Sequence, residues 1–214
     1  YLVPRRQIPQ AVGLLQAQGY RLNNNGKPDN PEQLLKNKTA YVVTMLRNSP
    51  RVAVELHWDV LPPATLFDLD QDFYWEWLRP SQCLGLEVPM FAPEEQFFLL
   101  CLHNEKHSWH SPRFILDVIR IMDCNPGLDW PRIRQLAERW RRCLGIDMTL
   151  RVIQDIFGLP VPSEAWTERC EPARLAQRAA MIRARLFRHP YGYPPYAEWI
   201  ACQARSGERA TGFI

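Results

Sequence analysis

The sequence predicts an α+β protein, with a sheet and one helix in its front part and helices in the remainder. Two segments between residues 41 and 58 alternate apolar with polar residues, which is the pattern of strands buried on one face. After residue 90, apolar residues recur at helical spacing. Strands that precede a run of helices are typical of α+β folds. We therefore expect an α/β core at residues 1–90, a helical domain at 91–188 and a tail or arm at 189–214.

The composition is that of a soluble globular protein. The chain has 214 residues, of which 46% are hydrophobic and 23% charged. A net charge of +3 is weak evidence for any partner, and we do not expect nucleic acid. No apolar run is long enough to cross a membrane, and no signal peptide is visible. The six cysteines form no CxxC pair, so we expect reduced thiols and a cytoplasmic location.

The first 31 residues predict a strand fragment, a helix, a short strand and a loop. Tyr1–Val3 has the character of the end of a strand. The helix begins at Pro4 and closes at Gly19. Its apolar face is formed by Ile8, Val12 and Leu15. Tyr20–Leu22 is expected as a short strand, and the Asn-, Gly- and Pro-rich residues 23–31 as a loop.

The two main strands are expected at residues 41–46 and 52–58, joined by a turn at Arg47–Arg51. The second strand, VAVELHW, alternates cleanly. One face is formed by Val52, Val54, Leu56 and Trp58, and the other by Ala53, Glu55, His57 and Asp59. Two interpretations stay open for the polar face. It either meets water or lines an active-site cleft with Glu55 as a metal ligand.

A connector rich in Pro and aromatic residues, with weak helical periodicity, is expected at residues 61–89. The central helix then begins at Pro93, with Glu94 and Glu95 near the positive end of its dipole. Residues 97–102 are all apolar, so this helix is expected to be buried on most sides. We expect it to continue to Ser111, because the residue before Pro112 disfavours helical backbone.

The end of the central helix bears a stripe of polar residues at helical spacing: His103, Lys106, His107 and His110. One interpretation is a helix end in solvent. A second is a cleft wall that presents a cation and imidazoles to an anion. A third is a metal site, since His103 and His107 are four residues apart. A zinc protease is not expected, because the HExxH motif needs Glu where Asn104 stands.

Four further helices are expected. The first follows Pro112, with Arg113, Asp117 and Arg120 on one edge and Phe114, Val118 and Ile121 on the other. The second is capped by Asp129, and the third spans about residues 147–157. The fourth begins near Pro172 and buries Leu175, Ala179, Ile182 and Leu186. Its other side has an arginine stripe of Arg174, Arg178, Arg185 and Arg188, which fits a solvated face or, less often, a surface for phosphate or nucleic acid.

Several segments, in matching order over residues 1–162, resemble a little-characterised nucleotidyltransferase family of the DNA polymerase beta superfamily. They are YLVPRRQIPQAVGLLQAQGY, VAVELHW, PEEQFFLLCLHNEKHSWHSPRFILDVIRIM, the later DW and IFGLPVP. The absence of GxxxxGK[ST], GxGxxG and GxSxG motifs argues against the common phosphate-loop, dinucleotide and hydrolase sites. The resemblance implies a nucleotidyltransferase-like mixed sheet with flanking helices, followed by a C-terminal helical region.

The resemblance also implies Mg²⁺ as cofactor and a nucleoside triphosphate (NTP) as substrate. In that superfamily an Asp-x-Asp pair and a third carboxylate hold two Mg²⁺ ions. The third carboxylate corresponds to Glu55, which is then both catalytic residue and metal ligand. The Asp-x-Asp pair is expected immediately before Tyr1, and since Tyr1 is not a methionine we expect the chain to have lost residues at its front.

The remaining site residues follow from this implied chemistry. Lys106 is expected to neutralise phosphate charge as a catalytic and binding residue. His57, His103 and His107 are expected in the nucleotide site, with Glu55 and His57 in a cleft that faces the helix of Lys106. Asp117 either orients Lys106 or pairs with its neighbouring arginines on the surface.

Two function classes follow. The first is a Mg²⁺-dependent enzyme that transfers a nucleoside monophosphate to a small-molecule, peptide or protein acceptor. The second is a catalytically inactive relative that serves as a binding or assembly partner. The tail at residues 189–214 has no helical period at its start and is expected to dock on the body or on a second chain, so a homo-oligomer through this tail is possible.

Overall fold

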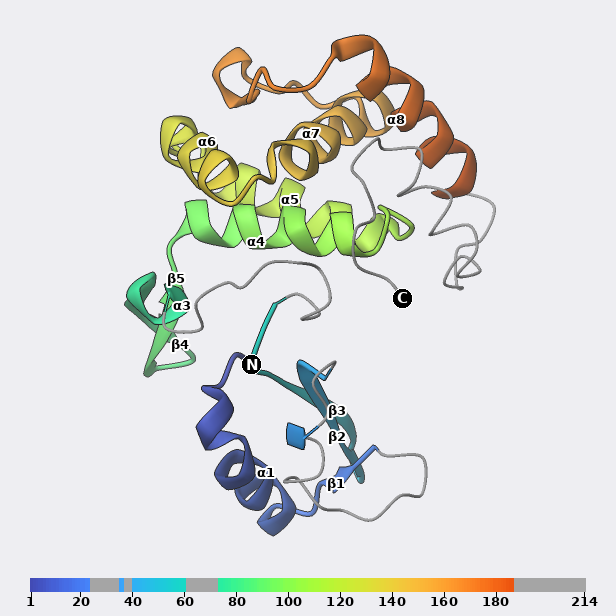
Figure 1. The fold of residues 1–214 in the computed structure, drawn as a ribbon. Helices are drawn as coiled ribbons and strands as arrows, with labels where there is room; N and C mark the ends of the chain where they lie inside the picture. The colour runs from blue at the N-terminus through green and yellow to red at the C-terminus, as the bar shows by residue number, and fades with distance from the viewer. Residues whose placement is uncertain (24–34, 37–39, 61–72, 187–214) are drawn as a thin grey trace. The chain divides into compact units, whose positions relative to one another are not determined.

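The computed structural model describes residues 1–23, 35–36, 40–60 and 73–186 (Figure 1). By packing, the chain divides into one compact unit that ends at Glu76 and a second that begins at Trp77, and we describe each separately. The division into domains after residues 90 and 188 stays a prediction. Within the described ranges, no helix has both the length and the apolar character needed to cross a bilayer.

The first unit contains a small sheet. Its strands are β1 (Arg21–Leu22), β2 (Val42–Asn48) and β3 (Arg51–His57), which pair antiparallel in the order β1-β2-β3. Leu2 adds a parallel bridge to His57 at the end of β3. The predicted α+β fold is confirmed, and the named strands of this sheet pair antiparallel throughout. The turn between β2 and β3 is as short as two residues, because Asn48 already pairs with Arg51.

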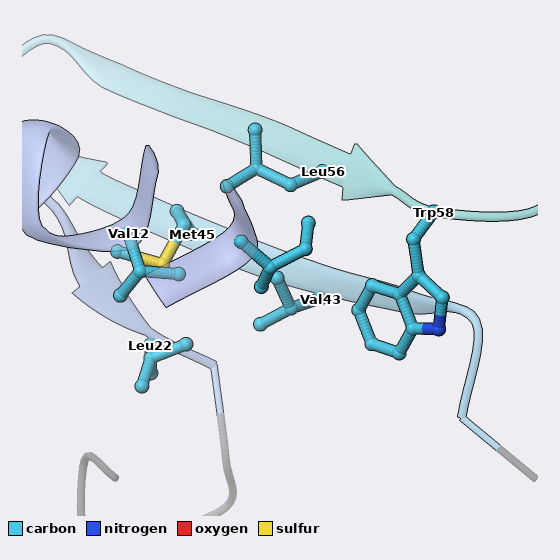
Figure 2. Close-up of a cluster of buried hydrophobic side chains, with 7 residues drawn as sticks. Val12, Leu22, Val43, Met45, Leu56 and Trp58 are labelled. Carbon is cyan, nitrogen blue, oxygen red and sulfur yellow. The ribbon is translucent and has the colours of Figure 1, made fainter. Parts of the chain in front are cut away.

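Helix α1 (Ile8–Ala17) follows the short 3₁₀ turn η1 (Arg5–Gln7) and packs on one face of this sheet. The core lies between them and consists of Ile8, Val12, Leu22, Val43, Met45, Leu56 and Trp58 (Figure 2). The alternation predicted for β3 is confirmed, because Leu56 is buried in this core while Glu55 is exposed. The period of two in the sequence therefore determined which face of β3 remains in contact with water.

The expected connector at residues 61–89 lies partly outside the described residues, and the part that is described corrects it. After the short helix α3 (Phe73–Glu76), β4 (Leu78–Cys83) and β5 (Leu86–Phe91) form an antiparallel hairpin. The two prolines within it argued against strands, but Pro80 lies directly opposite Pro89. In an antiparallel hairpin, pairs that form ladder hydrogen bonds alternate with pairs that do not. The pair of Pro80 and Pro89 is of the second kind, so neither proline removes a ladder hydrogen bond.

The second unit is mainly helical. Its helices are α4 (Pro93–Lys106), α5 (Pro112–Cys124), α6 (Trp130–Arg139), α7 (Cys143–Phe157) and α8 (Pro172–Leu186), with the 3₁₀ turn η3 (Ser163–Ala165) before α8. Helix α4 packs against α5, α6 and α7, and α8 packs on α7 (Figure 1). The expected cap of α6 is confirmed, since the Asp129 carboxylate accepts a hydrogen bond of 2.9 Å from the Arg132 backbone N–H.

The expected end of α4 is wrong. The helix stops at Lys106 instead of continuing to Ser111, because Ser108 and Trp109 adopt left-handed backbone with φ of 52° and 50°. Helix α7 also begins earlier than expected, at Cys143. For α4, the helical pattern in the sequence continues past the observed end of the helix. For α7, the pattern begins after the observed start. In both cases, contacts from other helices determine the boundary.

An ion pair in the interior joins the end of α4 to the start of α7. Arg142 Nη1 lies 3.1 Å from Glu105 Oε1, and both side chains are largely buried. Gly145 leaves room for this pair: a Cβ atom at that position would lie 2.6 Å from Glu105 Oε2. The glycine therefore has a steric role in the first turn of α7.

We predict that Gly145→Ala lowers the free energy of unfolding by about 1–3 kcal/mol, the usual range for overpacking a core. Urea denaturation followed by circular dichroism measures this loss. The control is Gly127→Ala, because a Cβ at Gly127 meets nothing within 4 Å. Equal stability of the two variants would show that the Glu105 carboxylate can move without cost.

Candidate functional site

The exposed carboxylate of the sheet is Glu55. Its side chain is 59% exposed and points from β3 to the face opposite α1. His57, two residues along the same face, lies with Nε2 3.1 Å from Glu55 Oε2. The ring of Tyr41 lies 6.0 Å from the His57 ring. Thus Glu55 and His57, both predicted from the alternation of β3, form a connected polar pair on the surface of the sheet.

The first residues of the chain run parallel to β3 directly beside Glu55. The Val3 N–H donates to the His57 carbonyl at 2.7 Å, and the His57 N–H donates to the Tyr1 carbonyl at 2.8 Å. The Tyr1 amino group donates to the Glu55 carbonyl at 2.8 Å. The expected strand end at Tyr1–Val3 therefore appears as an isolated bridge at Leu2, and these residues lie along the edge of β3 that does not pair with β2.

The second group of predicted residues surrounds Phe114 at the junction of α4 and α5. The rings of His103, His107 and His110 lie 4.6, 5.1 and 5.6 Å from the Phe114 ring. His103 and His107 are themselves 4.5 Å apart. We call His103, His107 and His110 the histidine cluster. All three side chains are partly buried, as is that of Lys106.

The position of His110 corrects the predicted stripe. His110 does not lie on α4, which ends at Lys106, but in the turn before α5. Its Nδ1 lies 2.7 Å from the His107 carbonyl, and its ring lies 5.6 Å from the His107 ring. The histidine cluster is therefore held together by a reversal of the chain around Phe114 and not by helical spacing alone.

Burial and charge act together on His107. Removal from water, together with the smaller effects of the neighbouring His103, Lys106 and His110, lowers the pKa of His107 from 6.5 to about 3. Its imidazole is consequently neutral at physiological pH. A neutral ring offers one N–H donor and one acceptor nitrogen, so His107 is suited to hydrogen bonding and not to neutralising an anion.

Three buried side chains fix the backbone beneath the histidine cluster. Asn104 has no exposed surface, and its amide donates to the carbonyls of Leu100 and Phe114 at 3.0 and 2.9 Å. Glu105 pairs with Arg142, as described above. Trp109 is buried, and its Nε1–H donates to Thr149 Oγ1 at 2.9 Å.

These anchors tie the end of α4 to both of its neighbours. The Asn104 amide joins α4 to the first turn of α5, while Glu105 and Trp109 join it to α7. Thr149 also donates to the Gly145 carbonyl at 2.7 Å, so its single hydroxyl is both acceptor and donor. The turn that bears Lys106 and His107 is thereby positioned by buried polar contacts on its opposite side.

No sequence motif predicts these anchoring residues. In the sequence, Asn104 stands out only as the residue that breaks the HExxH motif, and Glu105 and Trp109 belong to no predicted site. The signal that could have identified them is their spacing: Asn104 and Glu105 follow the buried residues Cys101 and Leu102 at an interval of three on the inner side of α4. A polar residue at a position that the pattern marks as buried requires a hydrogen-bond partner.

Asp117 lies on α5 with an exposed side chain, as do Arg113 and Arg120. The Arg113 guanidinium lies over the Phe114 ring, 5.3 Å from its centre. Phe114 is thus contacted by the histidine cluster and by a cation. The structure places Glu55 and His57 in the first unit and Lys106, the histidine cluster and Asp117 in the second, so the facing of Glu55 and Lys106 stays a prediction.

Comparison with known proteins gives one match. The family model described as an uncharacterised nucleotidyltransferase matches residues 1–158, about three quarters of the chain. A search of curated proteins and a search of solved structures each gave no significant match. The matched region includes Glu55, His57, Lys106, the histidine cluster and Asp117, and it ends at the last residues of α7.

We predict that Thr149→Val lowers the free energy of unfolding by about 1–3 kcal/mol, because the buried Trp109 N–H then lacks an acceptor. Thermal and urea unfolding measure the loss. Thr149→Ser is the matched control, since it retains the hydroxyl. If valine and serine at this position unfolded alike, the Trp109 hydrogen bond would not be an anchor.

The lowered pKa of His107 predicts an acid-side loss of stability. In the unfolded chain this imidazole gains a proton near pH 6.5, whereas in the folded protein it stays neutral until about pH 3. The free energy of unfolding is therefore expected to fall as the pH decreases from about 6.5 towards 3. Urea titrations at pH 7 and pH 5 should show a larger decrease for the wild type than for His107→Gln, and an NMR titration of His107 with a midpoint near 6.5 would contradict the prediction.

Proposed function

We propose, from the premise that the chain belongs to the uncharacterised nucleotidyltransferase family, that it moves a nucleoside monophosphate from an NTP to an acceptor hydroxyl or phosphate. Family membership supports a role in nucleotidyl transfer in general. The dependence on Mg²⁺ and the class of acceptor, whether small molecule, peptide or protein, are part of the proposal. In the proposed reaction the acceptor oxygen bonds to the α-phosphorus, and the bond from that phosphorus to the leaving pyrophosphate breaks.

The observation that supports this proposal most directly is the position of Glu55. It is an exposed carboxylate on a rigid strand, in contact with His57 and beside the parallel backbone of Tyr1–Val3. Any residue that precedes Tyr1 in a longer form of the chain would continue the strand neighbouring Glu55. An Asp-x-Asp pair at that place would project carboxylates to the same region of the sheet, because alternate residues of a strand share a face.

The described residues by themselves do not complete a site for Mg²⁺. Glu55 offers carboxylate oxygen, the ligand type that Mg²⁺ prefers. However, no group of three His, Cys, Asp or Glu side chains that could hold a metal ion occurs in the described part of the chain. Asp59 is no substitute, because it is 7% exposed whereas the Glu55 side chain is 59% exposed. We therefore assign Glu55 as one proposed ligand and derive no step through the ion.

Lys106 and the histidine cluster are proposed as contacts to the triphosphate. Lys106 supplies the positive charge, and a charged donor to phosphate is stronger than a neutral one. His107 is neutral at physiological pH and would donate or accept a single hydrogen bond. Since buried anchors fix the turn that holds Lys106, this contact would require little ordering when the nucleotide binds.

The role of Asp117 and the location of the protein are also proposals. Asp117 is exposed beside Arg113 and Arg120 on α5, so an ion pair on the surface and an interaction with Lys106 both fit its position. A cytoplasmic location is supported by the cysteines, because Cys83, Cys101, Cys124 and Cys143 are in no disulfide. Burial raises the pKa of the Cys101 thiol, which therefore stays protonated and inert.

We predict that Lys106→Ala weakens NTP binding by about 1–3 kcal/mol, the range for loss of a charged hydrogen bond. Isothermal titration calorimetry measures the affinity, and the melting temperature should change little. Lys36→Ala, at an exposed lysine of the first unit, is the matched control. Unchanged affinity together with a large drop in melting temperature would make Lys106 a structural residue.

The role of Glu55 is tested with Glu55→Gln, in a form of the chain that includes the residues expected before Tyr1. Mg²⁺-dependent binding of NTP should be lost in this variant and retained in Glu87→Gln, which changes an exposed carboxylate of the hairpin. The 214-residue chain alone is expected to transfer no labelled nucleotide. Turnover by that chain, abolished by Glu55→Gln, would mean that other carboxylates complete the site, and Mg²⁺ binding by neither form would favour the inactive binding or assembly partner.

A further inference from the structure

Helix α8 lies beyond the part of the chain that the family model matches, so the proposed transfer reaction does not account for it. Its orientation is nevertheless fixed. Four apolar residues on one side are buried against the rest of the second unit: Leu175, Ala179, Ile182 and Leu186. They recur at intervals of three and four, and α8 packs along α7 (Figure 1). The buried side therefore fixes which of the other residues of α8 face away from the core.

The charge on α8 has one sign. The helix contains four arginines and no acidic residue: Arg174, Arg178, Arg183 and Arg185. At 3.6 residues per turn, Arg174, Arg178 and Arg185 fall within an arc of about 40°, at one border of the buried side. Arg183 falls about 160° away from them, at the other border. We call the arginines at these two borders the arginine rows: Arg174, Arg178 and Arg185 form the first, and Arg183 alone forms the second.

The face between the arginine rows and away from the core has mostly small side chains, with one neutral polar residue and the partly buried Met181 near its border with Arg174. Ala173, Gln177, Ala180 and Ala184 on this face are exposed. Arg174 and Arg183 are exposed as well, and the Arg174 side chain is 71% exposed. A partner could thus approach the helix backbone closely and meet a guanidinium group on each side.

This arrangement disfavours the helix when it is alone in water. Arginines four residues apart repel one another, as Arg174 and Arg178 do by their spacing. Arg174 also stands in the first turn, near the positive end of the helix dipole, where no acidic residue is present. Among the described residues, Arg174 lies 3.8 Å from Glu171, just before the helix.

We propose that α8 is a docking helix that enters the major groove of B-form DNA and holds the phosphates of both strands with its arginine rows. An α-helix is about 10 Å across and the major groove about 12 Å wide, with phosphates along both of its walls. The low, alanine-rich face would meet the base edges, and arginine binds phosphate through two parallel hydrogen bonds. This activity is separate from the proposed nucleotidyl transfer.

The two-sided placement of the arginines favours a DNA duplex over other polyanions. An acidic protein segment would need only one arginine row. The major groove of an RNA duplex is too deep and narrow to admit a helix. Because Gln177 is the only polar side chain on the exposed alanine face, the binding is expected to depend little on base sequence.

The test is fluorescence anisotropy of a labelled 20-base-pair DNA duplex with the 214-residue chain at several salt concentrations. Four phosphate contacts, one from each of the four arginines of α8, predict a slope of about −3.6 for log K against log salt, or a roughly 150-fold loss between 50 and 200 mM. The double variant Arg174→Ala/Arg183→Ala should reduce the slope by about 1.8. The matched control is Arg113→Ala/Arg120→Ala, which removes two exposed arginines from α5 and should leave the slope unchanged.

Several results would overturn the proposal. Absence of duplex binding at 50 mM salt would do so, as would equal effects of the two double variants, which would indicate attraction by net charge alone. Competition by polyglutamate as effective as by unlabelled duplex would assign the arginine rows to an acidic protein. Tighter binding of an RNA duplex would exclude insertion into the groove. Circular dichroism of both double variants confirms that α8 remains folded, since neither removes a buried side chain.

Discussion

The hydrogen bond from Trp109 to Thr149 is the interaction on which the arrangement of the second unit depends. It lies in an apolar interior, where an N–H group without an acceptor is costly. Helix α4 ends at Lys106, and two residues with left-handed backbone follow before the Trp109 side chain reaches Thr149. The energetic cost of this backbone conformation must be compensated by other contacts. The reversal brings His110 back to Phe114 and begins α5 beside α4. One buried donor therefore determines both where a helix ends and which side chains gather there.

The neighbouring Glu105–Arg142 pair contributes differently. The free energy needed to remove two charges from water nearly equals the free energy gained from their attraction, so a buried ion pair is weak evidence of added stability. Losing one partner is nevertheless severe, because the other charge is left unpaired. The pair, together with the space left by Gly145, thus favours one register of α4 against α7 over alternatives of similar apolar contact. Specificity of packing at this seam is what keeps Lys106 and His107 in a defined place.

The residues proposed to be functional lie on parts of the chain that differ in how they are supported. Glu55 stands on a strand whose opposite face is buried in the core of the first unit, so its backbone is rigid while its carboxylate is free to meet solvent. Lys106 and His107 stand on a turn held from within. The arginine rows of α8 stand on a helix that the matched family region does not include. In each case, buried residues on the opposite side of the strand, turn or helix hold the outward-facing residues in position.

The sequence by itself determined which face of β3 and of α8 is buried. The period of two predicted Leu56 inside and Glu55 outside, and the period near 3.6 predicted the buried residues of α8. Only the tertiary structure decided the end of α4, the β4–β5 hairpin and the roles of Asn104 and Trp109. The reason is distance along the chain: Trp109 meets Thr149 across 40 positions, and Pro80 is tolerated because the register with β5 places it where no ladder hydrogen bond is needed. The periodicity of apolar residues predicts the side of an element on which a residue lies. The hydrogen-bond or packing partner of that residue is determined by the tertiary fold.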